Sequence, residues 1–511
     1  MGYLDAFVPS GNSKARSVKT SWSGLDRKHT QDTGALTQAT NIATTHLPFL
    51  RVAESNTAKK QFLGREIYGV YDVGDGCFVV AYLVSKDATE QGKAYLFLSY
   101  VRADGTEAIT QGPIQSDFAY GEGISISVVP FNVYNEQDDN IAAATYERKI
   151  LVYPFAKSFS PPKQGAPFLV LSDINVPPAE GETIGGNYVP LLEHAAVHMG
   201  RVFGTIAGKV YASAWNNYAD FTLPTAEDTA SGKNLESMAW MSTTQSDVNA
   251  SGEFTAIAVY DNHVVGFKRN FMHQIYNNKN PFRIADIARI GALSQEAVCE
   301  CNRILFFVSE DGIYGYTGGY PECISDNLEI ASFEGAVLGA DDRVLYCYIP
   351  SQGDVLTYDT VSHAWGTNGH ETHPIVSMAT CGGECLYAVN HGDGIVSEVK
   401  RFGGSPCGDF FLETDVSYGG ELMEKRILKI RLQVARKSSL GNDADYVRLA
   451  LMQNDKQLDK LVQTNENKVY VISMNVRNNC AFGHKVRIEG HGDFEIRYLQ
   501  IEYEEGGDRY V

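Results

Sequence analysis

The segments RILFFVSEDGIYGYTGG at 303–319 and RVLYCYIPSQGDVLTYDTVSHAW at 343–365 decide the fold. Each contains an apolar strand, a turn rich in Gly and Asp, and a second strand that carries aromatic residues. Related units are RVFGTIAGKVYASAWNNYADF from 201, FTAIAVYDNHVVGFKRN from 254 and CLYAVNHGDGIVSEVKRF from 385. Aromatic and β-branched residues favour strands and Gly favours tight turns, so each unit predicts a pair of strands.

The spacing of these units indicates a repeat. Their turns fall near Gly208, Asn262, Gly312, Gly353 and Asp393, at intervals of 54, 50, 41 and 40 residues. A four-stranded propeller blade takes roughly 40–50 residues. In YDTVSHAW, at 358–365, the Tyr and the later Trp are expected to wedge between neighbouring sheets. With two more units before residue 155, the spacing predicts an all-β protein with a β-propeller of six or seven blades over 66–402. Stacked β-sandwiches are the alternative that the same spacing permits.

The two ends of the chain differ from this repeat. Residues 1–65 are mostly polar and contain only short apolar runs, which predicts an extended N-terminal arm. The run GGSPCGD at 403–409 predicts a linker, and the alternation of apolar and charged residues that restarts at Leu428 predicts strands with one buried face. Gly490-His491-Gly492-Asp493 is typical of a hairpin turn. We therefore expect a C-terminal β-sandwich over 403–511 that folds on its own.

The net charge of −19 is unevenly distributed. Residues 1–65 carry nine Lys and Arg against four acids, or +5, and the rest of the chain carries −24. A basic arm on an acidic body predicts contacts with an acidic neighbouring copy, made by Arg16, Lys19, Arg27 and Lys28. The alternative is a solvated tail. The acidic body should repel nucleic acid and membrane phosphates, so DNA would pass it without sticking.

The sequence gives no sign of export or of a membrane anchor. The start MGYLDAFVPSGNSKARS has no apolar signal core, and no run approaches 18 apolar residues. The nine cysteines are scattered and odd in number, which predicts reduced thiols in a protein synthesised in a cytoplasm.

No pattern predicts a catalytic, cofactor or metal site. His363, His370 and His373 and the pair Cys381 and Cys385 lack the spacing of a strong metal motif. Nucleophile elbows and phosphate loops are also missing. The run Ser309-Glu310-Asp311-Gly312 is similar to the Asp-box turn of sialidases, but it does not recur. A hairpin turn with Gly312 at positive φ is the better interpretation.

Four stretches resemble sequences in the propeller proteins of bacteriophage tails and necks. FKRNFMHQIYNNKNPFRIADIARIGALSQEAV (267–298) and LFFVSEDGIYGYTGGYPECISDNLE (305–329) match their phrases at Gly291-Ala292, Ser309 to Tyr316 and Ile324-Ser325. GHKVRIEGHGDFEIRYLQIEYEEGG is similar to their terminal sandwich, and SGLDRKHTQDTGALTQATN to their opening arm. The resemblance covers about 23–507 and contains no catalytic signature.

The resemblance implies a structural virion protein of a tailed phage, located in the tail. It implies a nozzle or hub ring, of six copies by analogy with phage tails, with neighbouring tail or neck proteins as partners and DNA passing through during ejection. The alternative is a propeller that binds or cleaves host glycans, for which aromatic platforms would be needed. Two of the four Trp, Trp215 and Trp365, are expected in blade cores, which leaves little support for that alternative.

Overall fold

The computed structural model describes residues 16–19, 22–28, 34–85, 93–111, 118–119, 124–135, 145–156, 169–172, 190, 192–206, 208–242, 252–369, 371–392, 396–405, 408–415, 425–438, 445–453, 456–464, 466–476, 480–481 and 484–505. Almost every element in these ranges is a strand. The helical segments described there are α1 (Ala226–Ala230) and a 3-10 turn at Leu235–Ser237. The predicted all-β class is confirmed.

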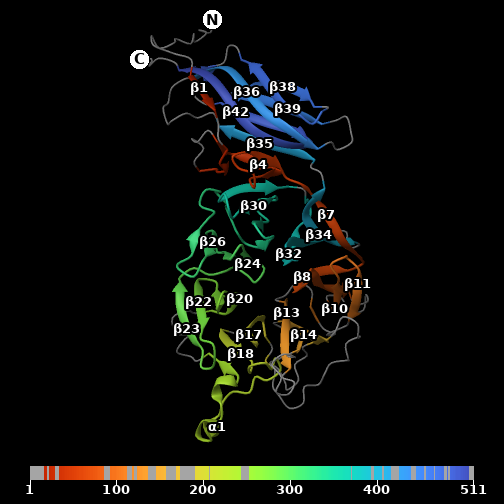
Figure 1. Cartoon of the computed structure of the whole chain (residues 1–511), viewed down its shortest axis with the longest axis vertical. Coiled ribbons are helices and arrows are strands. Elements are labelled where there is room, and N and C mark those ends of the chain that lie inside the picture. The colour runs from red at the N-terminus through yellow and green to blue at the C-terminus, as the bar shows by residue number, and fades with distance from the viewer. Residues whose placement is uncertain are drawn as a thin grey trace.

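Seven antiparallel sheets of the described residues surround a common axis (Figure 1). Blade 1 contains β8 (Glu66–Gly74), β9 (Cys77–Ser85), β10 (Lys93–Val101), β11 (Glu107–Gln111) and β12 (Phe118–Ala119), and blade 2 contains β13 (Ile124–Asn135), β14 (Thr145–Ala156) and β15 (Leu169–Ser172). Blade 3 contains β16 (His194–His198), β17 (Arg201–Ile206), β18 (Lys209–Ala212) and β19 (Trp240–Met241), and blade 4 contains β20 (Phe254–Tyr260), β21 (His263–Lys268), β22 (Phe271–Tyr276) and β23 (Arg283–Ala288).

The remaining blades follow the same order from the inside outwards. Blade 5 contains β24 (Val298–Cys301), β25 (Ile304–Val308), β26 (Ile313–Tyr316) and β27 (Glu322–Cys323), and blade 6 contains β28 (Val337–Ala340), β29 (Val344–Tyr348), β30 (Val355–Asp359) and β31 (Ala364–Asn368). Blade 7 contains β32 (Ile375–Cys381), β33 (Glu384–Asn390), β34 (Val396–Ser405) and an outer strand from the N-terminal segment, β7 (Ser55–Leu63).

The innermost strands close into a ring. β8 contacts β13, and the contacts continue through β16, β20, β24 and β28 to β32, which returns to β8. The described chain therefore forms a propeller of seven blades, the higher of the two predicted numbers. The wedge predicted in YDTVSHAW is present as well. The Trp365 ring lies 4.9 Å from that of Tyr358, and its indole N–H donates to the carbonyl oxygen of Ile324, between blades 5 and 6 (2.8 Å).

The last blade is completed from the other end of the chain. β7 pairs with β34, with Leu63 opposite Val396. Phe62 is 1% exposed and packs between blades 7 and 1, with its ring centroid 5.8 Å from that of Tyr82. The predicted start of the propeller at residue 66 is therefore wrong, because its closing strand precedes that residue.

The rest of the N-terminal segment joins the propeller to the sandwich. β4 (Gln38–Thr40) pairs with β35 (Asp409–Asp415) of the sandwich, and β5 (Ile42–Ala43) pairs with β31 of blade 6. β6 (Leu50–Val52) lies between β5 and β42 (Asp493–Glu505), and β1 (Arg16–Lys19) also pairs with β42. The short parallel pair β2 (Gly24–Leu25) and β3 (Ala35–Leu36) lies beside them. These strands are extended, as predicted, but they pair within their own chain.

The basic arm was expected to contact a neighbouring copy, but these strands are ordered by partners in their own chain. The segment has few apolar residues, but Leu36, Ile42 and Leu50 are all fully buried. They enter a single hydrophobic cluster that contains Phe306 and Leu345 of the propeller together with residues of the sandwich. A segment too short to bury a core of its own can thus be ordered by completing a shared one.

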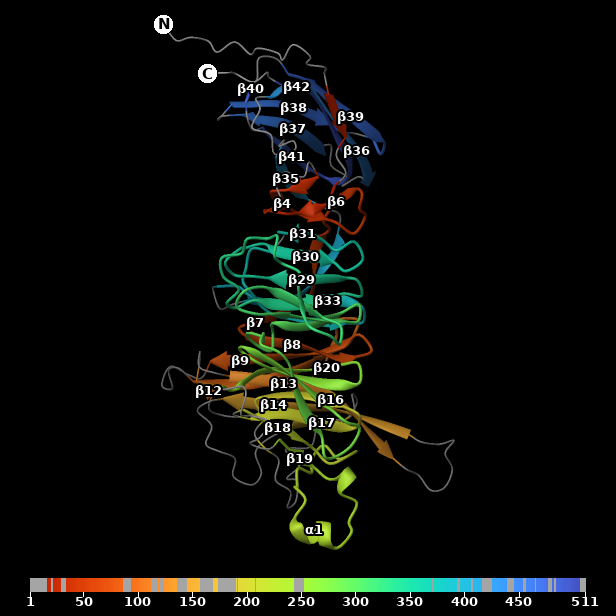
Figure 2. The ribbon, with the colours of Figure 1, turned by 90° about the vertical axis from the view of Figure 1, so that its left-hand side faces the viewer.

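The C-terminal part is a sandwich of two sheets. One sheet runs β38 (Lys456–Gln463), β37 (Tyr446–Gln453), β41 (Lys485–His491), β35 and β4; the other runs β39 (Val469–Asn475), β36 (Lys425–Ser438), β42 and β6, with β40 (Cys480–Ala481) beside β36. The second sheet continues through β5 into blade 6, so one sheet spans both parts. The sandwich therefore stands on the rim of the propeller, and α1 lies at the opposite end of the long molecule (Figure 2). The sandwich is not built from residues 403–511 alone, because its sheets and its core include N-terminal residues.

Candidate functional site

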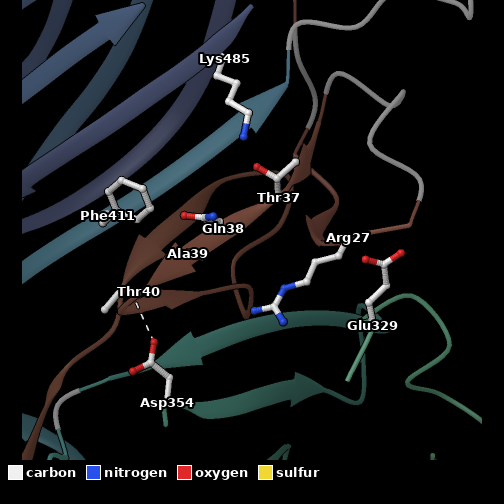
Figure 3. Close-up of a pocket in the computed structure, with 9 residues that line it drawn as sticks. All are labelled: Arg27, Thr37, Gln38, Ala39, Thr40, Glu329, Asp354, Phe411 and Lys485. Carbon is white, nitrogen blue, oxygen red and sulfur yellow. Dashed lines mark hydrogen bonds between the residues drawn. The ribbon is translucent and has the colours of Figure 1, made fainter. Parts of the chain in front are cut away.

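A polar cleft of about 480 Å³ lies at the junction of propeller and sandwich (Figure 3). Phe411 and Lys485 line it from the sandwich, and Asp354 and Glu329 line it from the propeller. Arg27 and the segment 37–40 form the wall between them. β4 is the edge strand of its sandwich sheet, and its residues form part of the cleft wall. The cleft therefore lies along the seam at which the N-terminal segment joins the sandwich to the propeller.

Arg27 is the one predicted contact residue in this cleft. Its backbone N–H donates to the carbonyl oxygen of Asn327 (2.8 Å), and its guanidinium donates to Oε1 of Gln352 (2.7 Å) and to the carbonyl oxygen of Leu328. All three partners belong to the propeller of the same chain. Arg27 therefore fastens the N-terminal segment to blades 5 and 6, a role that differs from the predicted contact with a neighbouring copy.

The other predicted contact residues lie apart from the cleft or outside the described side chains. Lys28 follows Arg27 and is exposed, and its backbone N–H donates to Oδ1 of Asp26. Arg16 and Lys19 lie on β1, opposite Tyr503 and Gln500 of β42, and their side chains are outside the described part. The structure does not bring the four residues into one site, and their contact with another copy stays a prediction.

A buried carboxylate anchors the sandwich side of the cleft. Glu413 is 4% exposed and binds Lys485 at 2.8 Å and Arg487 at 3.1 Å. Burial raises the pKa of Glu413, but the hydrogen bonds and charges of Lys485 and Arg487 outweigh it and hold that pKa below its ordinary value. Across the cleft, burial raises the pKa of Asp354 in spite of its hydrogen bond from Thr40. The sandwich side of the cleft thus carries paired charges, and the propeller side carries a carboxyl group whose pKa is raised.

We expect Glu413→Gln to lower the free energy of unfolding at pH 7 by about 1.5–3 kcal/mol, the usual value of hydrogen bonds to a charged group. Because the pKa is lowered in the folded state, the carboxylate stabilises the fold above its unfolded-state pKa, and this contribution is lost as the pH falls through the folded-state pKa. Denaturant unfolding at pH 7 and pH 3 measures both effects, and the variant should approach the wild type at the lower pH. Glu466→Gln is the control, since Glu466 pairs with Lys468 on the surface. An equal loss at both pH values would contradict the assignment.

The histidines and cysteines considered as metal ligands have other partners. His363 Nδ1 lies 3.0 Å from the Tyr358 hydroxyl, and His373 Nδ1 lies 3.1 Å from Glu371. Burial raises the pKa of the Cys381 and Cys385 thiols, which keeps them protonated. His370 lies outside the described residues. Within the described ranges, no three His, Cys, Asp or Glu side chains are placed to hold a metal ion.

The turn at Ser309 to Gly312 is a hairpin turn, but Gly312 is needed there for a different reason than predicted. The backbone N–H of Ser309 donates to the carbonyl oxygen of Gly312 (2.8 Å), and Gly312 does not have a positive φ. A Cβ at this position would lie 2.9 Å from Sγ of Cys323 and 3.1 Å from Oγ of Ser325. Close packing, and not left-handed backbone, therefore requires the glycine.

Trp215 is exposed, contrary to the expectation that it lies in a blade core. Its side chain is 53% exposed, beside Met199 at 45%, in the insertion between β18 and β19 that carries α1. The fully buried guanidinium of Arg201 orders this insertion by donating to the carbonyl oxygens of Ser213, Glu236 and Met238. Trp215 is thus presented on an ordered insertion, and the helix α1 of that insertion lies at the end of the molecule opposite the sandwich (Figure 2).

Sequence reasoning also missed an open edge at the other end. β38 and β39 are the last strands of the two sandwich sheets, on the side away from the propeller. Leu458 and Leu461 on β38 and Val469 and Val471 on β39 are each between 42% and 58% exposed. The signal was present in VYVISMN at 469–475, a run of seven residues without a charge, and such a run is unusual on the surface of a soluble sandwich.

Comparisons with known proteins bear on the fold only. No known family matches the sequence, and no curated protein matches it either. Among solved structures, the β-propeller domain of Cps50 (Swd1) from Myceliophteria thermophila is 8% identical, with a TM-score of 0.37, and the match covers 68% of this chain and 99% of that one. The Pan2 WD40 domain of Neurospora crassa is also 8% identical, with a TM-score of 0.36 and coverage of 69% and 97%. No described helix is long and apolar enough to cross a membrane.

Proposed function

We propose that this protein is a non-enzymatic structural component of a tailed-phage virion. In this proposal several copies, six by analogy with phage tails, form a ring in the tail, beside other tail or neck proteins, and DNA passes through that ring. The sequence resemblance supports the proposal through 267–298 and 305–329. In the structure these stretches form most of blades 4 and 5 and the connection that receives Arg27, so they belong to the framework of the propeller.

The observation that carries the proposal is the way in which the N-terminal segment joins the two parts. One sheet runs without interruption from β28 in the propeller to β39 in the sandwich, through β5 and β6. Arg343 adds a further tie, because its guanidinium binds both oxygens of the buried Asp359 and donates to the carbonyl oxygen of Thr45 (2.8 Å). An enzyme that closes on a substrate commonly keeps hinges between its parts. A stiff, elongated subunit suits the proposed ring, whose wall has to transmit force and keep its shape.

The charge distribution fits passage of DNA. The chain from residue 66 onwards carries −24, and a phosphate backbone is repelled by such a surface and does not adhere to it. In the proposed ring the DNA passes between the copies, along the axis of the ring.

A second candidate function is the binding of host glycans, and the exposure of Trp215 is the observation that favours it. An exposed indole on an ordered insertion offers a flat apolar face on which a sugar ring can stack. Asn217 beside it is exposed and could donate hydrogen bonds to hydroxyl groups.

The two functions give different results in one experiment. Full-length protein is examined by size-exclusion chromatography with light scattering and by negative-stain imaging, with and without host surface polysaccharide. We expect closed rings of uniform copy number, unchanged by the polysaccharide and by Trp215→Ala. A monomer at all concentrations that binds or shortens the polysaccharide, with binding lost in Trp215→Ala, would replace the first proposal by the second.

A further inference from the structure

The outer edge of β39 offers a row of backbone groups for another strand. The backbone N–H of Arg436 donates to the carbonyl oxygen of Lys468 (3.1 Å), and that of Val476 donates to the carbonyl oxygen of Leu428 (2.9 Å). In an antiparallel ladder the direction of these groups alternates, so residues 469, 471, 473 and 475 direct theirs away from β36. Among the described residues, the partner of this row is the ammonium of Lys460, which donates to the carbonyl oxygen of Ser473 (2.7 Å).

The composition of β39 makes this edge unusual. The strand VYVISMN contains no charge, no Pro and no Gly, and Val469 and Val471 are 42% and 58% exposed. Soluble proteins usually protect such an edge with charges, Pro or a bulge, because it readily accepts a further strand. Among the described residues, a single lysine covers a single carbonyl group of this edge. The edge is therefore suited to binding an extended segment by strand addition.

The same sandwich already binds strands in this way at its other edges. β1 and β6 add to β42, and β4 adds to β35, and all three come from the N-terminal segment. β1 and β39 lie on opposite sides of the central pair β42 and β36 (Figure 1). In this protein, strands of the N-terminal segment thus already pair with the edges of both sandwich sheets.

The direction of β1 indicates which copy would receive the residues that precede it. Arg16 lies opposite Tyr503 and Lys19 opposite Gln500, so the chain traced backwards leaves beyond the end of β42. β39 pairs with Lys429–Ala435 of β36, a stretch that overlaps the part opposite β1 only in its first residues and continues towards the other end of β36. The N-terminal end of β1, at Arg16, therefore lies at the end of β42 that is farther from the middle of β39. Fully extended, the 15 residues before β1 span up to about 50 Å, which is enough to reach a neighbour.

We propose that residues 3–8 of one copy add as a strand to the open edge of β39 in a neighbouring copy. The run Tyr3-Leu4-Asp5-Ala6-Phe7-Val8 is apolar except for Asp5, and Pro9 ends it. Its apolar side chains cover Val469 and Val471, and Asp5 supplies the one carboxylate for Lys460 at the otherwise uncharged edge. This inference rests on the proposed assembly of several copies and names the contact between them.

The test separates the donor strand from the acceptor edge. Deletion of residues 2–12 removes the donor, and Val471→Asp blocks the acceptor. Val361→Asp is the matched control, since Val361 is a 61% exposed valine in a turn of blade 6. Light scattering should show assembly of the wild type and the control, and monomers for the other two. A mixture of the deletion variant and Val471→Asp should form one-to-one pairs that grow no further, because each partner lacks what the other supplies.

A synthetic peptide of residues 1–12 provides a readout that does not depend on the ring. The labelled peptide should bind the deletion variant in fluorescence anisotropy, and Val471→Asp in that variant should weaken binding at least about tenfold. Val469→Lys serves as a second acceptor variant if Val471→Asp lowers the melting temperature. Rings that form equally well without residues 2–12 would overturn this inference and leave the ring proposal standing. A wild type that stays monomeric would overturn both proposals, even if the deletion variant binds the peptide. An absence of both pairing and peptide binding would overturn the strand addition.

Discussion

Phe62→Ala should lower the free energy of unfolding by about 3–5 kcal/mol, the usual cost of removing a buried phenyl ring. Phe62 is 1% exposed and lies in the cluster that joins the first and last blades, with Tyr82 on one side and Val399 on the other. β7 joins the beginning of the propeller to its end, so a cavity at this position weakens the closure of the whole ring. Urea unfolding followed by circular dichroism measures the change.

Leu63→Ala is the control for Phe62→Ala, because Leu63 is the next residue of the same strand and is 67% exposed. Its removal should change stability by less than about 0.5 kcal/mol. Similar losses for the two variants would show that β7 does not close the propeller. A loss confined to Phe62→Ala, with an unchanged m-value, would support one cooperative unit that includes the N-terminal segment.

The isolated segment 408–511 should show no cooperative thermal transition, although it contains most of the sandwich. Without the N-terminal segment, β35 and β42 lose the strands β4, β6 and β1. The shared core also loses Leu36, Ile42 and Leu50, each of which is fully buried and contributes about 1.5–3 kcal/mol. The combined loss is comparable with the whole stability of a typical domain, about 5–15 kcal/mol.

A fusion of residues 34–54 to 408–511 through a flexible linker is the matched control for this experiment. It restores β4 and β6, and it restores the hydrogen bond from the Asn41 side chain to the carbonyl oxygen of Asp409 (2.7 Å). We expect scanning calorimetry to show a transition for the fusion and none for the isolated segment. A sharp transition for the isolated segment would show that the sandwich is self-contained after all.

Much of the fold followed from local pattern. The hairpin units and their spacing predicted the propeller because strand and turn propensities are properties of neighbouring residues. The hairpin turn before β42 was also predicted from neighbouring residues, and Gly492 in that turn has a φ of +129°. Within β36 the alternation predicted the buried side chains of Ile430, Leu432 and Val434. Leu428 is only half-buried, because the register shifts between Ile427 and Lys429, and a bulge of this kind is not visible in a two-residue pattern.

The candidate sites were predicted less well, and the reason is physical. Arg27 was recognised as a contact residue from its charge, but charge does not tell whether the partner belongs to the same chain. Trp215 lies in a repeat unit whose sequence otherwise resembles the other propeller units, which predicted a place in a blade core. Its exposure results from an insertion that Arg201 holds in place. Glu413 carries no local signal, since its partners Lys485 and Arg487 follow more than seventy residues later.

The sequence by itself determined the strands, the turns, the propeller and the acidic character of the body, because these depend on residues that are near one another in the chain. The tertiary structure decided where the N-terminal segment goes. β4, β5, β6 and β7 pair with strands more than three hundred residues away, and their short apolar stretches have nothing to bury until those strands exist. Strand pairing over such distances depends on which edges are left open once the other sheets have formed, and no local pattern carries that information.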